Sequence, residues 1–281
     1  MTQVKTTIDV NMNKIVGTDD ILLITFDTLR YDIAHEQLQA GGTPCLAEIL
    51  PNGWEKRHSP ANFTWAAHQA FFAGFFPTPA SPGIHERYFA ASFAGSATTG
   101  ANTYCFDGDN LITALKQKHY HTACIGGVGF FNKNTPLSSV FPDLFDESHW
   151  DESTGVTDPD STQNQICIAL DIIARQNKHR PGRPLFLFIN ISAIHQPNCF
   201  YVKNKTNDNK ETHAAALRYV DSQLAPLFQA LTQRGNPFCI ICSDHGTTYG
   251  EDGYTGHRLC HEKVWDVPFA AFTLSHKTDT A

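Results

Sequence analysis

The chain has 281 residues, of which 41% are hydrophobic and 11% aromatic, which is enough apolar material for one sizeable domain and excludes a disordered protein. Its formal net charge of −7 and its lack of Lys or Arg runs argue against a nucleic-acid partner and favour small molecules or other proteins. The first twenty residues lack the features of a secretory signal, and the longest apolar runs, such as Ile21–Phe26, are too short to cross a bilayer, so we expect a cytoplasmic protein without a membrane partner.

Short β-rich runs alternate with helical stretches along the chain, which is typical of an α/β fold with a mostly parallel central sheet flanked by helices. Strands are predicted at residues 21–27, 122–131, 184–192, 237–243 and 267–274. Helices are predicted at residues 43–50, 64–74, 110–119, 163–176 and 211–233, the last of them kinked or broken at Pro226. Since no internal repeat or linker interrupts the pattern, we expect a single catalytic domain over residues 1–281.

Two segments lack the periodicity of a helix or a strand. Residues 77–109 are rich in Gly, Pro, Ser, Thr and Ala, and a stretch of that length inside a compact domain is typical of a functional loop, so we expect an irregular insertion that serves as a lid. Residues 143–161 carry seven Asp or Glu and predict a solvated acidic loop. We expect substrate specificity to reside in these two segments.

The eight cysteines are scattered along the chain, and several lie inside apolar strand-like runs. Buried free thiols are therefore expected. Cys239 and Cys242 have C-x-x-C spacing, but on a strand their side chains point to opposite faces, which argues against a zinc knuckle.

Polar residues follow three of the predicted strands, at the point where an α/β sheet places its chemistry. Asp27 closes ILLITFD, His195 follows FLFINISAI, and the pair Asp244-His245 follows FCIICS. A single Asp after a strand is more often a turn or a helix cap, but three such positions that include an Asp-His pair indicate a site. Because carboxylates together with imidazole suit zinc or manganese, Asp27, Asp244 and His245 are the predicted metal ligands.

Thr64 stands at the start of a predicted helix, where the helix dipole and the free amides favour an anionic substrate. As a fourth ligand its hydroxyl would be deprotonated by the metal, which turns a poor nucleophile into an alkoxide near neutral pH. Taken alone, Thr64 is better explained as a helix N-cap, so its assignment depends on the residues around it.

The strings ILLITFDTLRYD, TPCLAEI, FTWAAHQAFFAGFFP, CSDHG and GEDGYTGH…VPF, in this order and spacing, resemble the alkaline phosphatase superfamily. Within it the chain is most similar to the sulfatase-like branch with the phosphoethanolamine transferases and lipoteichoic acid synthase. The likeness extends from about residue 21 to residue 274. It implies an alkaline phosphatase-like three-layer sandwich, in which Asp27, Asp244 and His245 match metal ligands and Thr64 matches the metal-bound nucleophile that forms a covalent intermediate.

Two further histidines match positions of the family. His195 lies in IHQP, and His257 lies in TGH at the spacing from His245 that the transferases have. The resemblance implies that these two histidines bind phosphoryl oxygens, protonate the leaving group or hold a second metal. We therefore expect one tight zinc or manganese site and a weaker second one at His195 and His257.

The chain departs from the sulfatases at two positions. Where they have Cys-x-Pro-Ser-Arg, this chain has Thr64-Trp65-Ala66-Ala67-His68, so no residue can become formylglycine and His68 replaces the arginine. Where they carry a catalytic lysine after Tyr-x-Thr-x-x-x-Gly, this chain has Gly127. Both differences favour phosphate or phosphonate esters over sulfate esters.

The sequence thus predicts a metal-dependent hydrolase of small-molecule phosphate or phosphonate esters that acts through a covalent Thr64 intermediate. A sulfatase-like hydrolase and a transferase that passes the phospho-group to an acceptor other than water are alternatives. A non-catalytic metal-binding family member is disfavoured because all four metal positions are intact. His261 is interpreted as a structural histidine, whereas His68 fits a structural or a functional role equally well, and the oligomeric state is not indicated.

Overall fold

The structure of the chain is a computed structural model that describes residues 3–6, 10–74 and 110–275. The predicted insertion and lid at residues 77–109 therefore lies outside the described residues. Among the residues described, none of the helices combines the length and the apolar composition that a membrane span requires.

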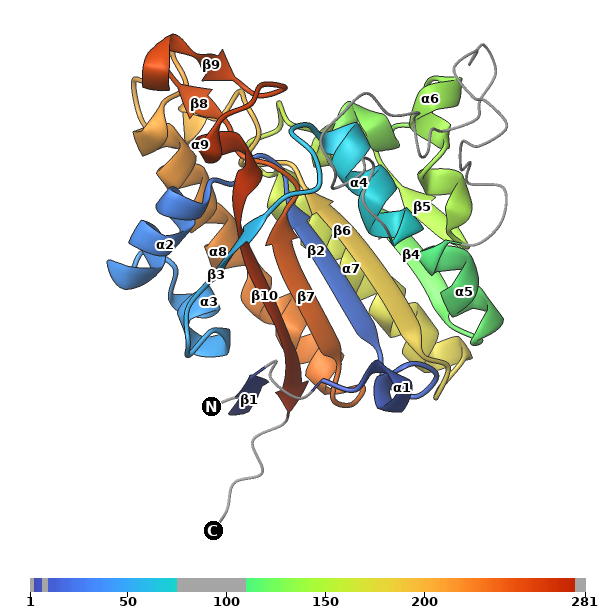
Figure 1. Ribbon diagram of the computed structural model, residues 1–281. Coiled ribbons are helices and arrows are strands. Elements are labelled where there is room, and N and C mark those ends of the chain that lie inside the picture. Colours follow the sequence, from blue (N-terminus) through green and yellow to red (C-terminus); the bar gives the residue numbers. More distant parts are fainter. Residues whose placement is uncertain (1–2, 7–9, 75–109, 276–281) are drawn as a thin grey trace, which may run out of the picture.

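A mostly parallel sheet of eight strands forms the centre of the molecule, as predicted (Figure 1). Its strands are β1 (Gln3–Thr6), β2 (Ile21–Phe26), β3 (Glu55–His58), β4 (His121–Ile125), β5 (Glu147–His149), β6 (Leu185–Ile191), β7 (Phe238–Ser243) and β10 (Asp266–Ser275). The order is β1-β10-β7-β2-β6-β4-β5, with β3 also paired to β10. The five strands from β7 to β5 are parallel to one another, whereas β10 runs antiparallel to β7, β1 and β3.

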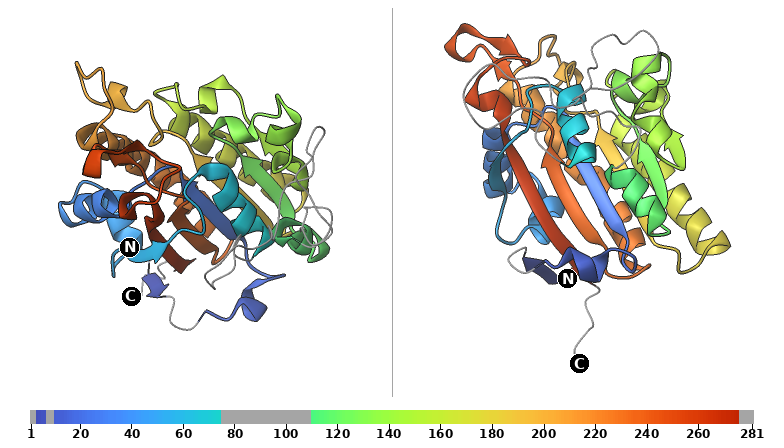
Figure 2. Two further views of the ribbon diagram at one scale, coloured as in Figure 1. Left: turned by 45° about the horizontal axis from the view of Figure 1, so that its top comes forward. Right: turned by 45° about the vertical axis from the view of Figure 1, so that its right-hand side comes forward.

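Helices cover both faces of this sheet. They are α1 (Met12–Ile15), α2 (Tyr31–Gln39), α3 (Pro44–Ile49), α4 (Thr64–Ala73), α5 (Leu111–Gln117), α6 (Pro136–Ser139), α7 (Ser161–His179), α8 (Lys210–Thr232) and α9 (Glu262–Trp265). Figure 1 shows α4 and α5 in front of the sheet and α7 and α8 behind it, and the turned views of Figure 2 show the same layers.

Strand β2 shows why the sheet needs cover on both sides. All six of its residues are buried, as is typical of a central parallel strand. Since side chains alternate along a strand, Leu22 and Ile24 join the core with α7 and α8, while Ile21 and Leu23 join a second, aromatic-rich core under α4 and α5. The α/β fold class follows directly from these two cores.

Three predicted elements differ from the structure. The strand predicted at residues 122–131 is shorter in the structure, where β4 ends at Ile125 because Gly126 and Gly127 follow it. Residues 129–131 form the 3₁₀ helix η2 (Gly129–Phe131) instead. Helix α8 continues through Pro226, which is exposed, so water can bond the carbonyl that loses its helical partner. The predicted acidic loop at 143–161 contains β5, which pairs with β4, and the 3₁₀ helices η3 (Pro142–Leu144) and η4 (Glu152–Thr154).

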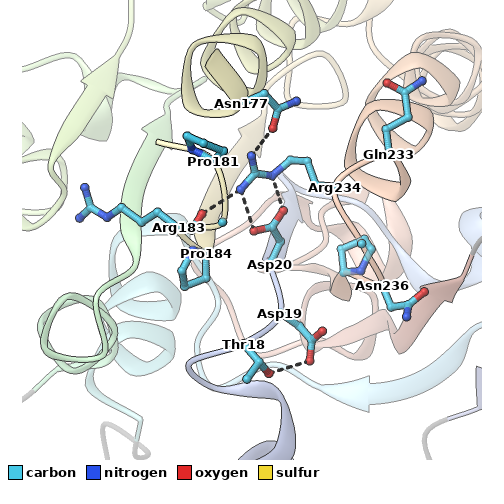
Figure 3. A pocket seen from close by; sticks show the side chains of 13 residues that line it. Thr18, Asp19, Asp20, Asn177, Pro181, Arg183, Pro184, Gln233, Arg234 and Asn236 are labelled. Atoms are coloured by element: carbon cyan, nitrogen blue, oxygen red, sulfur yellow. Dashed lines mark hydrogen bonds and ion pairs between the residues drawn. The ribbon is translucent and has the colours of Figure 1, made fainter. Parts of the chain in front are cut away.

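A polar pocket of about 350 Å³ lies where β2, β6 and β7 begin (Figure 3). Asp20 and Arg234, with side chains 8% and 7% exposed, form an ion pair there. The Asp20 carboxylate also accepts the Leu185 N–H at 2.7 Å, and the Asp20 carbonyl accepts the Phe238 N–H at 2.9 Å. These buried polar groups satisfy one another's hydrogen bonds, so Asp20 and Arg234 link the starts of the three strands.

Replacing Asp20 with Asn should destabilise the protein strongly. The change leaves the buried guanidinium of Arg234 without its counter-charge, which typically costs about 3 kcal/mol or more. Urea unfolding would measure the loss. The exposed Asp171 pairs with Arg175 on the surface of α7 and provides the control, since Asp171→Asn should change the free energy of unfolding by less than about 1 kcal/mol. Equal stability of the two variants would refute the anchoring role of Asp20.

Candidate metal centre and nucleophile

The predicted metal ligands lie together at the carboxyl ends of two neighbouring strands. Asp27 follows β2 directly, and Asp244 follows β7 directly. The two strands are parallel, with Phe26 level with Ser243, so the next residue on each strand reaches the same edge of the sheet. The strand register therefore brings two carboxylates side by side.

Asp27, Asp244 and His245 form a fully buried group whose candidate ligand atoms all lie within 4.8 Å of one another. Nε2 of His245 is 3.9 Å from Oδ1 of Asp27 and 3.6 Å from Oδ2 of Asp244. Within the described part of the chain, these two carboxylate oxygens have no hydrogen-bond partner. Buried carboxylate oxygens without a donor are costly, and a cation between them removes that cost.

The other polar atoms of these ligands are held by the protein. Oδ1 of Asp244 accepts the backbone N–H groups of Thr28, at 3.1 Å, and of His245, at 2.9 Å. Nδ1 of His245 donates to the Gly246 carbonyl at 2.8 Å, so in the neutral ring Nε2 carries the lone pair. A lone pair on Nε2 is what a metal requires, and this second contact fixes the ring in the productive tautomer.

The electrostatics of the group also favour a cation. Burial raises the pKa of Asp244 to about 7. Burial and the nearby charge of Asp244 raise the pKa of Asp27 to about 6. Burial lowers the pKa of His245. Two carboxylates and a neutral imidazole match the donors that zinc or manganese takes, so the residues present fit a divalent metal.

Thr64 lies beside this group as the first residue of α4. Its Oγ1 is 3.2 Å from Nε2 of His245 and 3.4 Å from Oδ2 of Asp27. Phe63, with an extended backbone, is the N-cap of α4, so the alternative interpretation of Thr64 as the N-cap is not what the helix shows. The preceding loop is anchored by Ser59, which donates its N–H to the Trp265 carbonyl at 2.7 Å and its hydroxyl to the Asp244 carbonyl.

His68 lies one turn further along α4 than Thr64 and is fully buried. Its Nδ1 donates to the Thr64 carbonyl at 2.8 Å, so its Nε2 accepts the Thr25 hydroxyl at 3.1 Å. Burial lowers the pKa of His68 to about 3, and the ring stays neutral. Thr25 also accepts from Asn190, which donates to Oδ2 of Asp27 as well, each at 3.2 Å. This chain of contacts ties Thr64 to β2 and to a metal ligand.

His195 and His257 lie close to this centre without completing a second three-residue group. Their ring centroids are 5.8 Å apart, and that of His257 is 4.5 Å from that of His245. Burial and the two neighbouring histidines lower the pKa of His257 to about 3. Among the described residues, the one group of three metal-binding side chains is Asp27, Asp244 and His245, so the second metal stays a prediction.

His261 has both ring nitrogens in contacts outside the centre. It is the N-cap of α9, where Nδ1 accepts the Lys263 N–H at 3.0 Å, and its Nε2 lies 3.2 Å from the Asp252 carboxylate.

Asn190 was not among the predicted site residues, although its polar side chain interrupts the apolar run of β6 and could have indicated a role.

The sequence and the fold of this chain resemble those of known proteins. A family model described as Sulfatase matches residues 19–271. A comparison with curated proteins found no match. Several solved structures share the fold, and three of them, at 13–16% identity, illustrate it.

The C-terminal periplasmic domain of the phosphoethanolamine transferase EptC from Campylobacter jejuni has a TM-score of 0.59 and 13% identity, with 91% of this chain and 80% of that chain covered. The corresponding domain of Escherichia coli EptC, in complex with Zn, has a TM-score of 0.61 and 14% identity, with 91% and 73% covered. The putative sulfatase yidJ from Bacteroides fragilis has a TM-score of 0.61 and 16% identity, with 92% and 68% covered.

Replacing Asp244 with Asn should remove metal binding without harming the fold. The amide oxygen can still accept the N–H groups of Thr28 and His245, while one of two repelling charges disappears. With a chelator, the variant should therefore unfold at or above the wild-type temperature. With Zn²⁺ or Mn²⁺ at about 100 times its Kd, the wild type should gain about 2.7 kcal/mol and the variant far less. A full metal-induced shift in the variant would contradict the site, and Asp171→Asn serves as the control.

Proposed function

The chain belongs to the sulfatase family, and on that basis we propose that it is a divalent-metal-dependent enzyme that cleaves phosphate or phosphonate esters with Thr64 as the nucleophile. The observation that carries this proposal is the position of the Thr64 hydroxyl, 3.2 Å from Nε2 of His245 and 3.4 Å from Oδ2 of Asp27. In the described part of the chain, Asp27 and Asp244 each keep one buried carboxylate oxygen without a hydrogen-bond partner. A helix N-cap needs no such surroundings.

Asp27, Asp244 and His245 would hold the metal, with Thr64 beside it. A bound divalent metal lowers the pKa of a neighbouring hydroxyl and attracts the charged oxygens of an ester. Thr64 then attacks phosphorus: the bond between phosphorus and Oγ1 forms, the bond between phosphorus and the ester oxygen breaks, and the alcohol leaves with a proton. Water next attacks phosphorus: a bond between phosphorus and the water oxygen forms, the bond between phosphorus and Oγ1 breaks, and Oγ1 takes up a proton from the water as phosphate leaves.

The remaining residues of the site would receive the charge that develops on the phosphoryl oxygens. Thr64 begins α4, and the first amides of a helix have no partner within it, so they are free to bond an anion. His195 and His257 line the pocket that Thr64 also lines. Donors placed in advance around an anionic transition state are a large source of rate enhancement.

Two features support phosphorus over sulfur chemistry. A Cβ atom on Gly127 would lie 2.3 Å from the Asn190 carbonyl oxygen and 2.7 Å from Cβ of Ser192, so the lysine that the sulfatase pattern has here cannot be accommodated. His68, at the position of the sulfatase arginine, is buried and neutral. Neither position therefore supplies a cation.

Transfer of the phospho-group to an acceptor other than water is the second candidate. The phosphoethanolamine transferases among the structural neighbours favour it. Both reactions would share the Thr64 adduct and differ in the second step. Increasing concentrations of an added alcohol would distinguish hydrolysis from transfer, because a transferase would form alkyl phosphate at the expense of inorganic phosphate.

Replacing Thr64 with Ala should lower the turnover of an aryl phosphate by at least about 1,000-fold, because the nucleophile is lost. Thr64→Ser keeps a hydroxyl and should retain part of the activity. The metal-induced shift in unfolding temperature should persist in both variants, which separates catalysis from metal binding. Mass spectrometry of acid-quenched wild type should find a phosphate on Thr64. Wild-type rates in Thr64→Ala would disprove the assignment.

Replacing Gly127 with Ala should destabilise the protein by about 1–3 kcal/mol or more, since the new methyl group overlaps backbone atoms of β6 and the residue after it. Gly129 offers a matched control, because a Cβ there would have its nearest contact, with Nδ2 of Asn132, at 3.7 Å. Thermal and urea unfolding of both variants would measure the difference. If Gly127→Ala were as stable as Gly129→Ala, space at this position would not be what excludes a lysine.

A further inference from the structure

The phenol oxygen of Tyr249 joins three segments that are distant from one another in the sequence. Tyr249 ends the short strand β8 (Thr248–Tyr249), and its hydroxyl lies 2.9 Å from Nδ1 of His213 in α8. In the loop after β6, Gln196 donates its side-chain amide to the same oxygen at 3.2 Å, and Asn198 does so at 3.4 Å. The hydroxyl thus connects β8, the loop after β6 and α8.

The direction of each of these hydrogen bonds follows from the protonation states. Burial raises the pKa of Tyr249 to about 12, so the phenol keeps its proton. Burial lowers the pKa of His213 to about 3, so the imidazole is neutral. The amide N–H groups of Gln196 and Asn198 can only donate, and Tyr249 therefore directs its own proton to Nδ1 of His213.

The side chains that Tyr249 holds fix the backbone on both sides of His195. Asn198 also donates to the Ile194 carbonyl at 2.8 Å. The Gln196 carbonyl accepts the Nδ1–H of His195, so in the neutral ring Nε2 carries the lone pair. The orientation of the His195 ring therefore depends on Gln196 remaining in place.

Tyr249 also belongs to the two-stranded sheet that precedes His257. Strand β8 pairs antiparallel with β9 (Thr255–Gly256), and His257 follows β9 directly. The backbone N–H of Tyr249 donates to Oε2 of Glu251 at 2.6 Å, and Oε1 of Glu251 accepts from the fully buried Arg30 guanidinium at 2.6 Å. The backbone of Tyr249 is thus held independently of its hydroxyl.

We infer that Tyr249 is a positioning residue whose hydroxyl fixes the separation of the His195 and His257 imidazoles, whose ring centroids lie 5.8 Å apart. Its backbone places the segment that leads to His257, and its hydroxyl places the loop of His195. The inference rests on the proposed function, in which these two histidines receive the charge of the phosphoryl oxygens. Such groups act through their placement, and a displacement of about 1 Å can cost about 100-fold in rate.

The variant Tyr249→Phe removes the hydroxyl alone and tests this role in the full chain with Zn²⁺ or Mn²⁺ supplied. It should lower kcat for an aryl phosphate by about 10- to 100-fold with KM close to the wild-type value, because the histidines act on charge that develops in the transition state. Gln196 and Asn198 keep other acceptors, the Thr247 hydroxyl and the Ile194 carbonyl, so the variant should fold. A metal-induced rise in unfolding temperature equal to that of the wild type would show an intact metal centre.

The matched control is His213→Leu, which removes the other end of the same hydrogen bond. Among the described residues, His213 has its side-chain hydrogen bond with Tyr249, and its buried Nε2 has no partner. A purely structural role of this bond predicts equal losses of kcat in Tyr249→Phe and His213→Leu. The positioning role predicts a kcat near that of the wild type for His213→Leu, because Gln196 and Asn198 keep their bonds to the hydroxyl.

The double variant Tyr249→Phe/His213→Leu keeps the test decisive if Tyr249→Phe alone is unstable. Replacing both partners of a buried hydrogen bond by apolar groups is often close to neutral for stability. The double variant should therefore unfold near the wild-type temperature and still show the loss of kcat.

The variant Gln196→Leu tests the route from Tyr249 to His195. It should lower kcat at least as much as Tyr249→Phe, and combining the two changes should bring little further loss, because both break the same contact. Fully additive losses would mean that the hydroxyl does not act through Gln196 and would overturn the inference.

The remaining outcomes distinguish this inference from the proposed function. If the wild type cleaves no aryl phosphate, or if Thr64→Ala cleaves it equally well, the proposed function fails and the inference fails with it. If cleavage depends on Thr64 but Tyr249→Phe keeps the wild-type kcat, changes only KM, or loses no more than His213→Leu, the positioning role is overturned while the proposed function stands.

Discussion

Two buried carboxylates that the protein does not neutralise are the constraint on which the site depends. Strands β2 and β7 end level with each other, so Asp27 and Asp244 meet at one point, each with an oxygen that no described donor reaches. Protein contacts hold the other oxygen of each carboxylate, through Asn190 in one case and through Thr28 and His245 in the other. Burying two like charges side by side is costly, and a bound cation would offset that cost.

Buried charge is neutralised by an ion pair at one end of the sheet and lacks such a partner at the other. At the amino ends, Asp20 and Arg234 neutralise each other and bond the starts of β2, β6 and β7 (Figure 3). At the carboxyl ends, Asp27 and Asp244 lack such a partner among the described residues. The same strands β2 and β7 therefore begin at a neutralised ion pair and end at two carboxylates whose charge the described residues leave without a partner.

Much of this site could be predicted from the sequence because short apolar runs ending in Asp27 and in Asp244-His245 mark the ends of buried strands. What the sequence could not show depends on tertiary contacts. The four residues of β3 are polar and mostly exposed, and they form a strand only because β10 lies beside them. The sequence alone does not show that Gly127 lies against the Asn190 carbonyl, where a side chain would not fit.

The anchoring of the loop before Thr64 has a consequence for the order of folding. The loop between β3 and Thr64 is held by the pairing of His58 with Asp266, by the bond from Ser59 to Trp265, and by the bond from Ser59 to Asp244. All of these partners lie some two hundred positions later in the chain, and such distant contacts form late. Until β10 pairs with β3, the loop before Thr64 lacks this support. The placement of Thr64 beside Asp27, Asp244 and His245 therefore forms late in folding, once distant parts of the chain have come together.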